Sequence, residues 1–223
     1  MSSEKLPAVE LETRPNPDAT VILMHGLGAD GNDFVPIVRE FELPKDHGVR
    51  FVFPHAPTRP VTINGGMSMR AWYDIVGVDL TTRGDETGIR ESQVIVEKFI
   101  AREKARGIKS SRIVLAGFSQ GGVIALQTGL RHPERLGGIM ALSTYLAMPQ
   151  KLAAEMHQAN RDIPIFMAHG TADPTIQLEW ADASRRALEA QGYKVDWHTY
   201  RMQHSVSLEE VRDMGAWLRK VLA

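Results

Sequence analysis

The sequence predicts an α/β domain in which helices cover both faces of a mainly parallel sheet. Short apolar runs of strand length recur along the 223 residues, and longer segments with helical spacing separate most of them. No internal repeat, charge block or low-complexity linker marks a second domain. We therefore expect residues 1–223 to form one domain, and the 43% of hydrophobic residues are enough for one sizeable core.

The expected strands are continuous runs rich in Val, Ile, Leu and Phe. Such runs are typical of strands that are buried on both faces of a parallel sheet. They cover residues 20–26, 49–54, 112–119, 138–143 and 163–170. A further strand is expected over KVDWHTY, residues 194–200.

Two long helices are expected from apolar residues at helical spacing. The apolar positions are Ile95, Phe99 and Ala105 over residues 88–107, and Leu208, Val211, Gly215, Leu218 and Leu222 over residues 206–222. Ser207 and Glu210 form the sequence signature of a capping box at the start of the second helix. A short helix is expected around residues 149–159, which leaves no room for a lid domain.

Residues 56–87 are expected to be a long irregular excursion. They contain NGGMSMRAWYD, and loops of this length are often functional.

Charge and cysteine content exclude several classes of function. The 26 Lys and Arg residues nearly balance the 27 Asp and Glu residues, so the positive field that attracts nucleic acids is missing and no nucleic-acid partner is expected. The absence of cysteine excludes a disulfide framework, a thiolate zinc site and a cysteine nucleophile. A polar N-terminal segment and the lack of any apolar stretch of about 18 residues predict a cytoplasmic protein without integral membrane association.

The segment RIVLAGFSQGGVIALQTGL predicts that Ser119 is a nucleophile. A strand-like run ends at Gly117 and a helix-like run begins at Ser119 or Gln120, so the serine lies in a very tight turn. Side chains at positions 117 and 121 would crowd this turn, which is the mechanical reason for the G-x-S-x-G pattern. The alternative is a small residue in a glycine-rich turn, but the strand and helix on either side favour the nucleophile.

A serine hydroxyl needs a base and an orienting acid, and both follow it in the chain. His204 stands in YRMQHSV, between the expected strand at 194–200 and the last helix. Asp173 follows the strand at 163–170, although an Asp-Pro pair is also a common turn former. The order Ser119, Asp173, His204 is the order of serine, acid and histidine in α/β-hydrolases.

Hydrolysis by a serine also requires N–H donors for the developing oxyanion. Gln120 follows the nucleophile and offers one backbone N–H. The second donor should lie in the glycine-rich loop LMHGLGADGNDF after the first strand. This loop lacks both G-x-x-x-x-G-K and G-x-G-x-x-G, which argues against a phosphate-binding loop.

Several motifs together resemble the phospholipase/carboxylesterase family, whose members are similar to acyl-protein thioesterases and small bacterial carboxylesterases. The motifs are HGLGADGNDF, RAWYDI, GFSQGG, HGTADP and MQHSV, in family order over nearly the whole chain. The resemblance implies the α/β-hydrolase fold, the triad Ser119, Asp173 and His204, and oxyanion donors at Leu27 and Gln120. It also implies substrate-binding positions in an acyl pocket at Trp72, Ile75, Tyr145 and Thr175.

The sequence departs from the family pattern before the histidine and in the pocket. Arg201 and Gln203 stand where the family more often has Pro and Gly, and Gln203 could adopt a positive φ only at a cost. Thr175 replaces a residue that is commonly apolar.

The expected activity is a metal-free and cofactor-free carboxylesterase-type serine hydrolase (EC 3.1.1 class) that acts on carboxylic esters of short-to-medium acyl chains through an acyl-enzyme. Acyl-protein thioesterase or lysophospholipase activity with the same triad is an alternative, and the resemblance is compatible with a homodimer. A non-catalytic ligand-binding protein with this fold is a further alternative. A metal hydrolase that uses His25, His169, Asp173 and His204 is disfavoured because no ligand spacing such as H-E-x-x-H is present.

Overall fold

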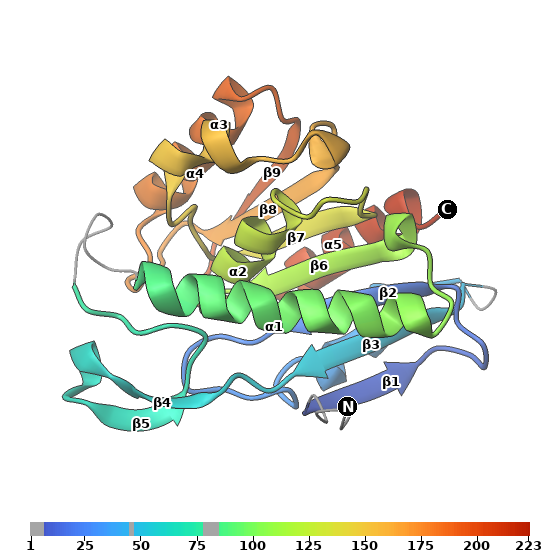
Figure 1. The fold of residues 1–223 in the computed structure, drawn as a ribbon, viewed down its shortest axis with the longest axis horizontal. Coiled ribbons are helices and arrows are strands. Elements are labelled where there is room, and N and C mark those ends of the chain that lie inside the picture. The colour runs from blue at the N-terminus through green and yellow to red at the C-terminus, as the bar shows by residue number, and fades with distance from the viewer. Residues whose placement is uncertain (1–6, 45–46, 78–84) are drawn as a thin grey trace.

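The computed structural model describes residues 7–44, 47–77 and 85–223 (Figure 1). Within these residues the main sheet has seven strands in the order β1-β3-β2-β6-β7-β8-β9. The strands are β1 (Ala8–Glu12), β2 (Ala19–Met24), β3 (Val49–Pro54), β6 (Ile113–Phe118), β7 (Gly138–Leu142), β8 (Ile165–Gly170) and β9 (Val195–Tyr200). Neighbouring strands run parallel except β1 and β3. The expected mainly parallel sheet is confirmed, and the antiparallel edge strand β1 is an addition that the sequence analysis missed.

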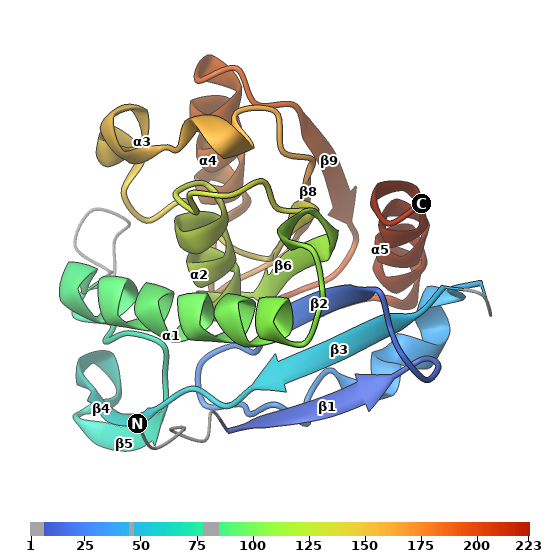
Figure 2. The same cartoon turned by 45° about the vertical axis from the view of Figure 1, so that its right-hand side comes forward.

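Helices cover both faces of this sheet, as the sequence predicted. Figure 1 shows α1 and α2 in front of the sheet and α5 behind it, and in Figure 2 the strands of the sheet separate α5 from α1 and α2. The helices are α1 (Glu86–Ala105), α2 (Gln120–Gly129), α3 (Pro149–Glu155), α4 (Leu178–Ala190) and α5 (Leu208–Val221), with short 3₁₀ turns η1 (Val35–Phe41), η2 (Thr62–Asn64), η3 (Ser110–Arg112) and η4 (Gln158–Asn160). None of the helices in the described parts of the chain has the length and apolar character that crossing a membrane requires.

The central strands are buried on both faces, and their side chains pack into two separate hydrophobic cores. On β2, Ile22 and Met24 pack into the core that α1, α2 and α4 cover. Val21 and Leu23, which alternate with them, pack into the core that η1 and α5 cover. This double burial explains the continuous apolar runs in the sequence.

Two details of the helices differ from expectation. Ala105 and Leu208 were expected on buried faces, but both are exposed because each is a terminal residue of its helix. Met214 and Trp217 fill the core side of α5 instead.

The excursion at residues 56–87 is more regular than expected. It contains an antiparallel pair of strands, β4 (Thr58–Val61) and β5 (Met67–Arg70), which forms a separate small sheet. Residues 78–84 of the excursion lie outside the described residues. The segment that follows β5 leads back to the main sheet, where Trp72 and Tyr73 are buried.

The capping box expected at the start of α5 is present. The Oγ atom of Ser207 accepts the Glu210 N–H at 3.1 Å, and a Glu210 carboxyl oxygen accepts the Ser207 N–H at 3.4 Å. The Glu210 side chain is fully buried, and burial raises its pKa to about 8. The carboxyl group is therefore protonated in the folded protein at neutral pH, which an exposed glutamate would not be.

This burial predicts a pH dependence of stability. Between the ordinary pKa of 4.5 and about 8, the folded state binds a proton at Glu210 that the unfolded state has lost. The free energy of unfolding should therefore fall as pH rises through this window, by at most about 1.4 kcal/mol per pH unit, and level off above it. Glu210→Gln keeps an acceptor for the cap and should flatten this fall in urea unfolding measured across the window.

Glu209→Gln is the matched control, since Glu209 is exposed in the same helical turn. It should leave the pH dependence of the wild-type protein in place. Parallel stability curves for the wild-type protein and Glu210→Gln would contradict the account of a buried, protonated Glu210.

Candidate active site

Ser119 occupies a strained turn between β6 and α2. Its φ of 55° and ψ of −119° lie in a region that residues with side chains rarely adopt. A Cβ atom at Gly117 would lie 2.2 Å from the backbone of Gly121, and a Cβ atom at Gly121 would lie 2.2 Å from the Met24 carbonyl oxygen. Both glycines are therefore required for the turn, as the G-x-S-x-G argument predicted.

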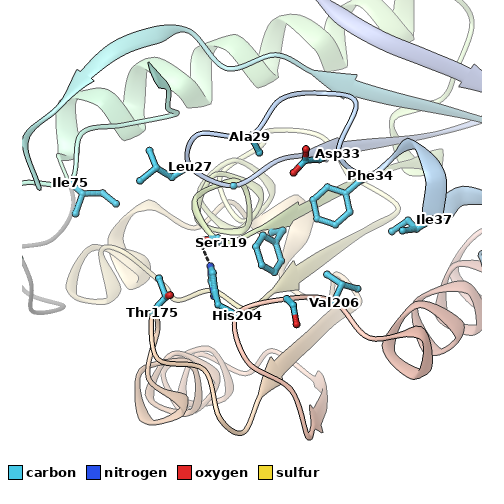
Figure 3. Close-up of a pocket in the computed structure, with 13 residues that line it drawn as sticks. Leu27, Ala29, Asp33, Phe34, Ile37, Ile75, Ser119, Thr175, His204 and Val206 are labelled. Carbon is cyan, nitrogen blue, oxygen red and sulfur yellow. Dashed lines mark hydrogen bonds between the residues drawn. The ribbon is translucent and has the colours of Figure 1, made fainter. Parts of the chain in front are cut away.

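Three side chains that are distant in the sequence form one hydrogen-bonded line. The Nε2 atom of His204 is 3.0 Å from the Oγ atom of Ser119, and its Nδ1 atom is 2.7 Å from a carboxyl oxygen of Asp173. Figure 3 shows the imidazole of His204 directed at the serine. The side chain of Asp173 is fully buried, whereas that of His204 is 18% exposed. The structure thus brings together all three residues of the expected triad.

The loop after β8 fixes the carboxylate of Asp173. Its other oxygen accepts the backbone N–H groups of Thr175 at 2.8 Å and Ile176 at 2.9 Å. His169 closes this loop, since its Nε2 atom is 2.9 Å from the carbonyl oxygen of Ile176. Burial lowers the pKa of His169, which favours the neutral ring in this position. With one oxygen held by the loop, the other oxygen of Asp173 binds His204, and the Nε2 atom of His169 lies 3.5 Å from that same oxygen.

The site lies at the carboxyl ends of the parallel strands. Ser119 follows β6, Asp173 follows β8, His204 follows β9, and the glycine-rich loop follows β2. Because β2 and β6 are paired, the glycine-rich loop and the serine turn are neighbours. Ligands of open α/β sheets bind at this edge.

Two backbone N–H groups beside Ser119 have no acceptor among the described residues. Within the part of the chain that the structure describes, the N–H groups of Leu27 and Gln120 donate to no other residue. Gly26 lies against Ser119, because a Cβ atom there would be 3.4 Å from the Cβ atom of Ser119. Gln120 is the first residue of α2, where backbone N–H groups favour negative charge. The two predicted oxyanion donors therefore flank the serine.

A cavity of about 510 Å³ opens over Ser119 and His204. Of the four predicted substrate-binding residues, Ile75 and Thr175 line it. Trp72 and Tyr145 lie outside its lining and are 0% and 1% exposed. Trp72 lies behind the site, where its ring packs against His25 with the centroids 5.5 Å apart.

The cavity has a second apolar side that the sequence analysis missed. Figure 3 shows Leu27 and Ile75 on one side of Ser119, and Phe34, Ile37 and Val206 on the other. Most of the missed residues belong to motifs already quoted, since Phe34 ends HGLGADGNDF and Val206 ends MQHSV. Membership of a motif was therefore the sequence signal that could have identified these cavity residues. Ile37 in η1 belongs to no quoted motif, so the sequence offered no such signal for it.

The substitution of Gln203 for the more common glycine introduces no strain. Gln203 is not among the described residues with a positive φ. A Cβ atom at position 170 would lie 2.4 Å from the Gln203 carbonyl oxygen, so the close packing of these two segments requires Gly170. His204 reaches Ser119 without a left-handed residue before it.

The alternative metal site has no support in the geometry. Among the described residues, no group of three or more His, Asp or Glu side chains is arranged to hold a metal ion. The ring nitrogens of His25 are 2.7 Å from the Gly26 carbonyl oxygen and 3.0 Å from the Ala56 nitrogen. These backbone contacts occupy both of its possible ligand atoms.

Comparisons with known proteins identify the family of the chain. The family model described as phospholipase/carboxylesterase matches residues 6–222. The chain is 37% identical over 219 residues to acyl-protein thioesterase 1 of Yarrowia lipolytica, covering 96% of each chain. It is 41% identical over 215 residues to acyl-protein thioesterase 1 of Neurospora crassa, covering 92% of this chain and 86% of the relative.

Solved structures show the same architecture. The crystal structure of Zea mays acyl-protein thioesterase 2 matches with a TM-score of 0.87 and 25% identity, over 98% of this chain and 100% of that one. The family match spans nearly the whole chain, and the mainly parallel sheet with helices is the architecture shared with these solved structures. The chain therefore belongs to the phospholipase/carboxylesterase family of α/β-hydrolases.

Proposed function

We propose that this protein hydrolyses carboxylic esters and thioesters of short-to-medium acyl chains through an acyl-enzyme on Ser119. The observation that carries the proposal is the hydrogen-bonded line from Ser119 through His204 to Asp173, beside two backbone N–H groups that have no acceptor in the described parts of the chain. This arrangement supplies a base, an orienting acid and an oxyanion site together, which acyl transfer requires.

In the first half of the reaction, the Oγ atom of Ser119 attacks the acyl carbon while the Nε2 atom of His204 takes the hydroxyl proton. The carbonyl oxygen becomes an oxyanion, to which Leu27 and Gln120 donate their N–H groups. The bond from the acyl carbon to the leaving oxygen or sulfur then breaks, and that atom receives the proton from His204. Asp173 accepts a hydrogen bond from Nδ1–H throughout and stabilises the charged imidazole.

In the second half, water replaces the leaving group. His204 takes a proton from the water as its oxygen attacks the acyl carbon of the acyl-enzyme. The new tetrahedral intermediate collapses, the bond to the Oγ atom of Ser119 breaks, and His204 returns the proton to the serine. The products are the free carboxylic acid and the regenerated enzyme.

The cavity supports an apolar acyl group of limited length. Its volume of about 510 Å³ is in the usual range for a small-molecule site, and its walls are mostly apolar side chains. Acyl-protein thioesterases are among the relatives, and this favours thioesters as a second substrate class for the same site. The mechanism accepts both classes because each presents the same carbonyl to Ser119.

A substrate panel tests the proposal. Matched oxygen esters and thioesters, with acyl groups from acetyl to palmitoyl, and a lysophospholipid should be assayed with the purified protein. We expect turnover of both ester types, with the highest kcat/KM for short-to-medium chains because longer ones exceed the cavity. Ser119→Ala should lower kcat by on the order of 10⁶-fold for every substrate and abolish labelling by a fluorophosphonate.

Ser111→Ala is the control, since Ser111 lies in η3, before the opposite end of β6. It should retain both labelling and turnover. Substantial activity in a folded Ser119→Ala variant would overturn the proposal.

Asp173→Asn tests the role of the acid. An asparagine side chain can still accept the N–H groups of Thr175 and Ile176, so the loop should keep its shape. Its amide group would not hold Nδ1–H of His204 in place, and kcat should fall by on the order of 10⁴-fold with a much smaller change in KM. A decrease of less than about tenfold in steady-state assays of the folded variant would remove Asp173 from this role.

A further inference from the structure

His25 and Trp72 are buried polar side chains to which the mechanism assigns no role. They are 1% and 0% exposed, and neither lines the cavity over Ser119. Both nevertheless bond directly to the backbone at the start of the glycine-rich loop. The Nδ1 atom of His25 is 2.7 Å from the Gly26 carbonyl oxygen, and the indole N–H of Trp72 donates to the His25 carbonyl at 2.9 Å.

The contacts of His25 fix which ring nitrogen carries the proton. The backbone N–H of Ala56 lies 3.0 Å from Nε2 and can only donate, so Nε2 is the unprotonated acceptor. Nδ1 therefore carries the proton of the neutral ring and donates to the Gly26 carbonyl. Burial lowers the pKa of His25 and so keeps the ring neutral, which preserves both bonds.

The Gly26 carbonyl and the Leu27 N–H belong to the same peptide unit. Because a trans peptide is planar, these two groups point in opposite directions. Holding the carbonyl on the imidazole of His25 therefore directs the N–H of Leu27 the other way. That N–H has no acceptor among the described residues, and the peptide lies against Ser119.

Trp72 joins the preceding His25–Gly26 peptide to the second donor residue. Its backbone N–H donates to the side-chain oxygen of Gln120 at 3.0 Å, while its indole N–H donates to the His25 carbonyl. The side-chain amide of Gln120 in turn donates to the Tyr73 carbonyl at 2.9 Å. Trp72 thus links the peptide that precedes the Gly26–Leu27 peptide to the side chain of Gln120, the second donor residue.

We propose that His25 and Trp72 are positioning residues that hold the Leu27 and Gln120 N–H groups in the geometry of an oxyanion site. This inference rests on the proposed function, because it assigns these residues a role in stabilising the oxyanion of that reaction. It also gives Trp72 a role behind the site, in place of direct contact with the acyl chain.

Side-chain replacements at position 25 separate this role from a merely structural one. His25→Asn places an amide N–H near the position of Nδ1 and can still donate to the Gly26 carbonyl. His25→Gln reaches toward the position of Nε2 instead, so it can satisfy Ala56 but leaves the Gly26 carbonyl with only the backbone N–H of Ala29, at 3.3 Å, as a donor. Both replacements remove the buried ring, and thermal unfolding should therefore show similar losses of stability for the two variants.

The readouts are kcat and KM for a soluble ester and the inhibition constant of a trifluoromethyl ketone that forms a tetrahedral adduct with Ser119. Loss of one oxyanion donor costs about 10²–10³-fold in kcat, and misdirecting one should cost less. We expect His25→Gln to lower kcat and the affinity for the ketone by the same factor, about 10- to 100-fold, with KM within about twofold of the wild-type value. His25→Asn should recover most of this loss.

Trp72→Phe keeps a ring against His25 and removes the indole N–H. It should lower kcat and ketone affinity in the same way, leave the preference for acyl length unchanged, and combine non-additively with His25→Gln. His132→Asn is the matched control, because His132 is a buried histidine that bonds to Glu97. It lies beyond the C-terminal end of α2, whereas Ser119 precedes the N-terminal end of that helix. This variant should alter stability without altering ketone affinity.

Equal kcat and ketone affinity in His25→Asn and His25→Gln would overturn this inference while Ser119 labelling remained intact. A change in the acyl-length preference of Trp72→Phe, with kcat for the best substrate unchanged, would also contradict it. Failure of the proposed function would look different, since a folded Ser119→Ala variant would then remain active.

Discussion

The strained backbone of Ser119 is the constraint on which the rest of the active site depends. A residue with a side chain at φ 55° and ψ −119° costs of order 1–3 kcal/mol, so the surroundings must hold it there. The Ser119 N–H donates to the Leu142 carbonyl at 2.9 Å, and the Ser119 carbonyl accepts the hydroxyl of Thr144 at 2.7 Å. Both partners come from β7 and the residues after it, so the neighbouring strand keeps the serine raised at the edge of the sheet.

The packing around the serine turn also positions the glycine-rich loop after β2. Gly121 packs so closely on the last residues of β2 and the start of the loop that a Cβ atom would be 2.2 Å from the Met24 carbonyl oxygen and 2.8 Å from that of His25. Pairing of β2 with β6 sets this contact. The strand order thus places the nucleophile and the loop together, and buried hydrogen bonds from His25 and Trp72 set the orientation of the peptide groups within the loop.

Local chemistry made much of the fold predictable, and with it the hydrogen-bonded line of Ser119, His204 and Asp173. The apolar runs predicted strands because the central strands are buried on both faces, and Gly117 and Gly121 indicated the serine turn because nothing larger fits there. The position of a side chain relative to a cavity depends on tertiary packing and was therefore harder to predict from the sequence. The sequence around Trp72 is the same whether the side chain lines a pocket or lies behind it, so the motif could not distinguish the two positions. Ile37 lines the cavity only because of where η1 lies in the fold.

A crystal structure of the protein after reaction with a fluorophosphonate tests the central claim most directly. The phosphorus atom should be bonded to the Oγ atom of Ser119, with the phosphoryl oxygen about 2.7–3.1 Å from the backbone nitrogens of both Leu27 and Gln120. The Nε2 atom of His204 should remain beside Oγ, and Nδ1 should remain on Asp173. A phosphoryl oxygen directed away from both nitrogens, or phosphorus bound to another residue, would contradict the account.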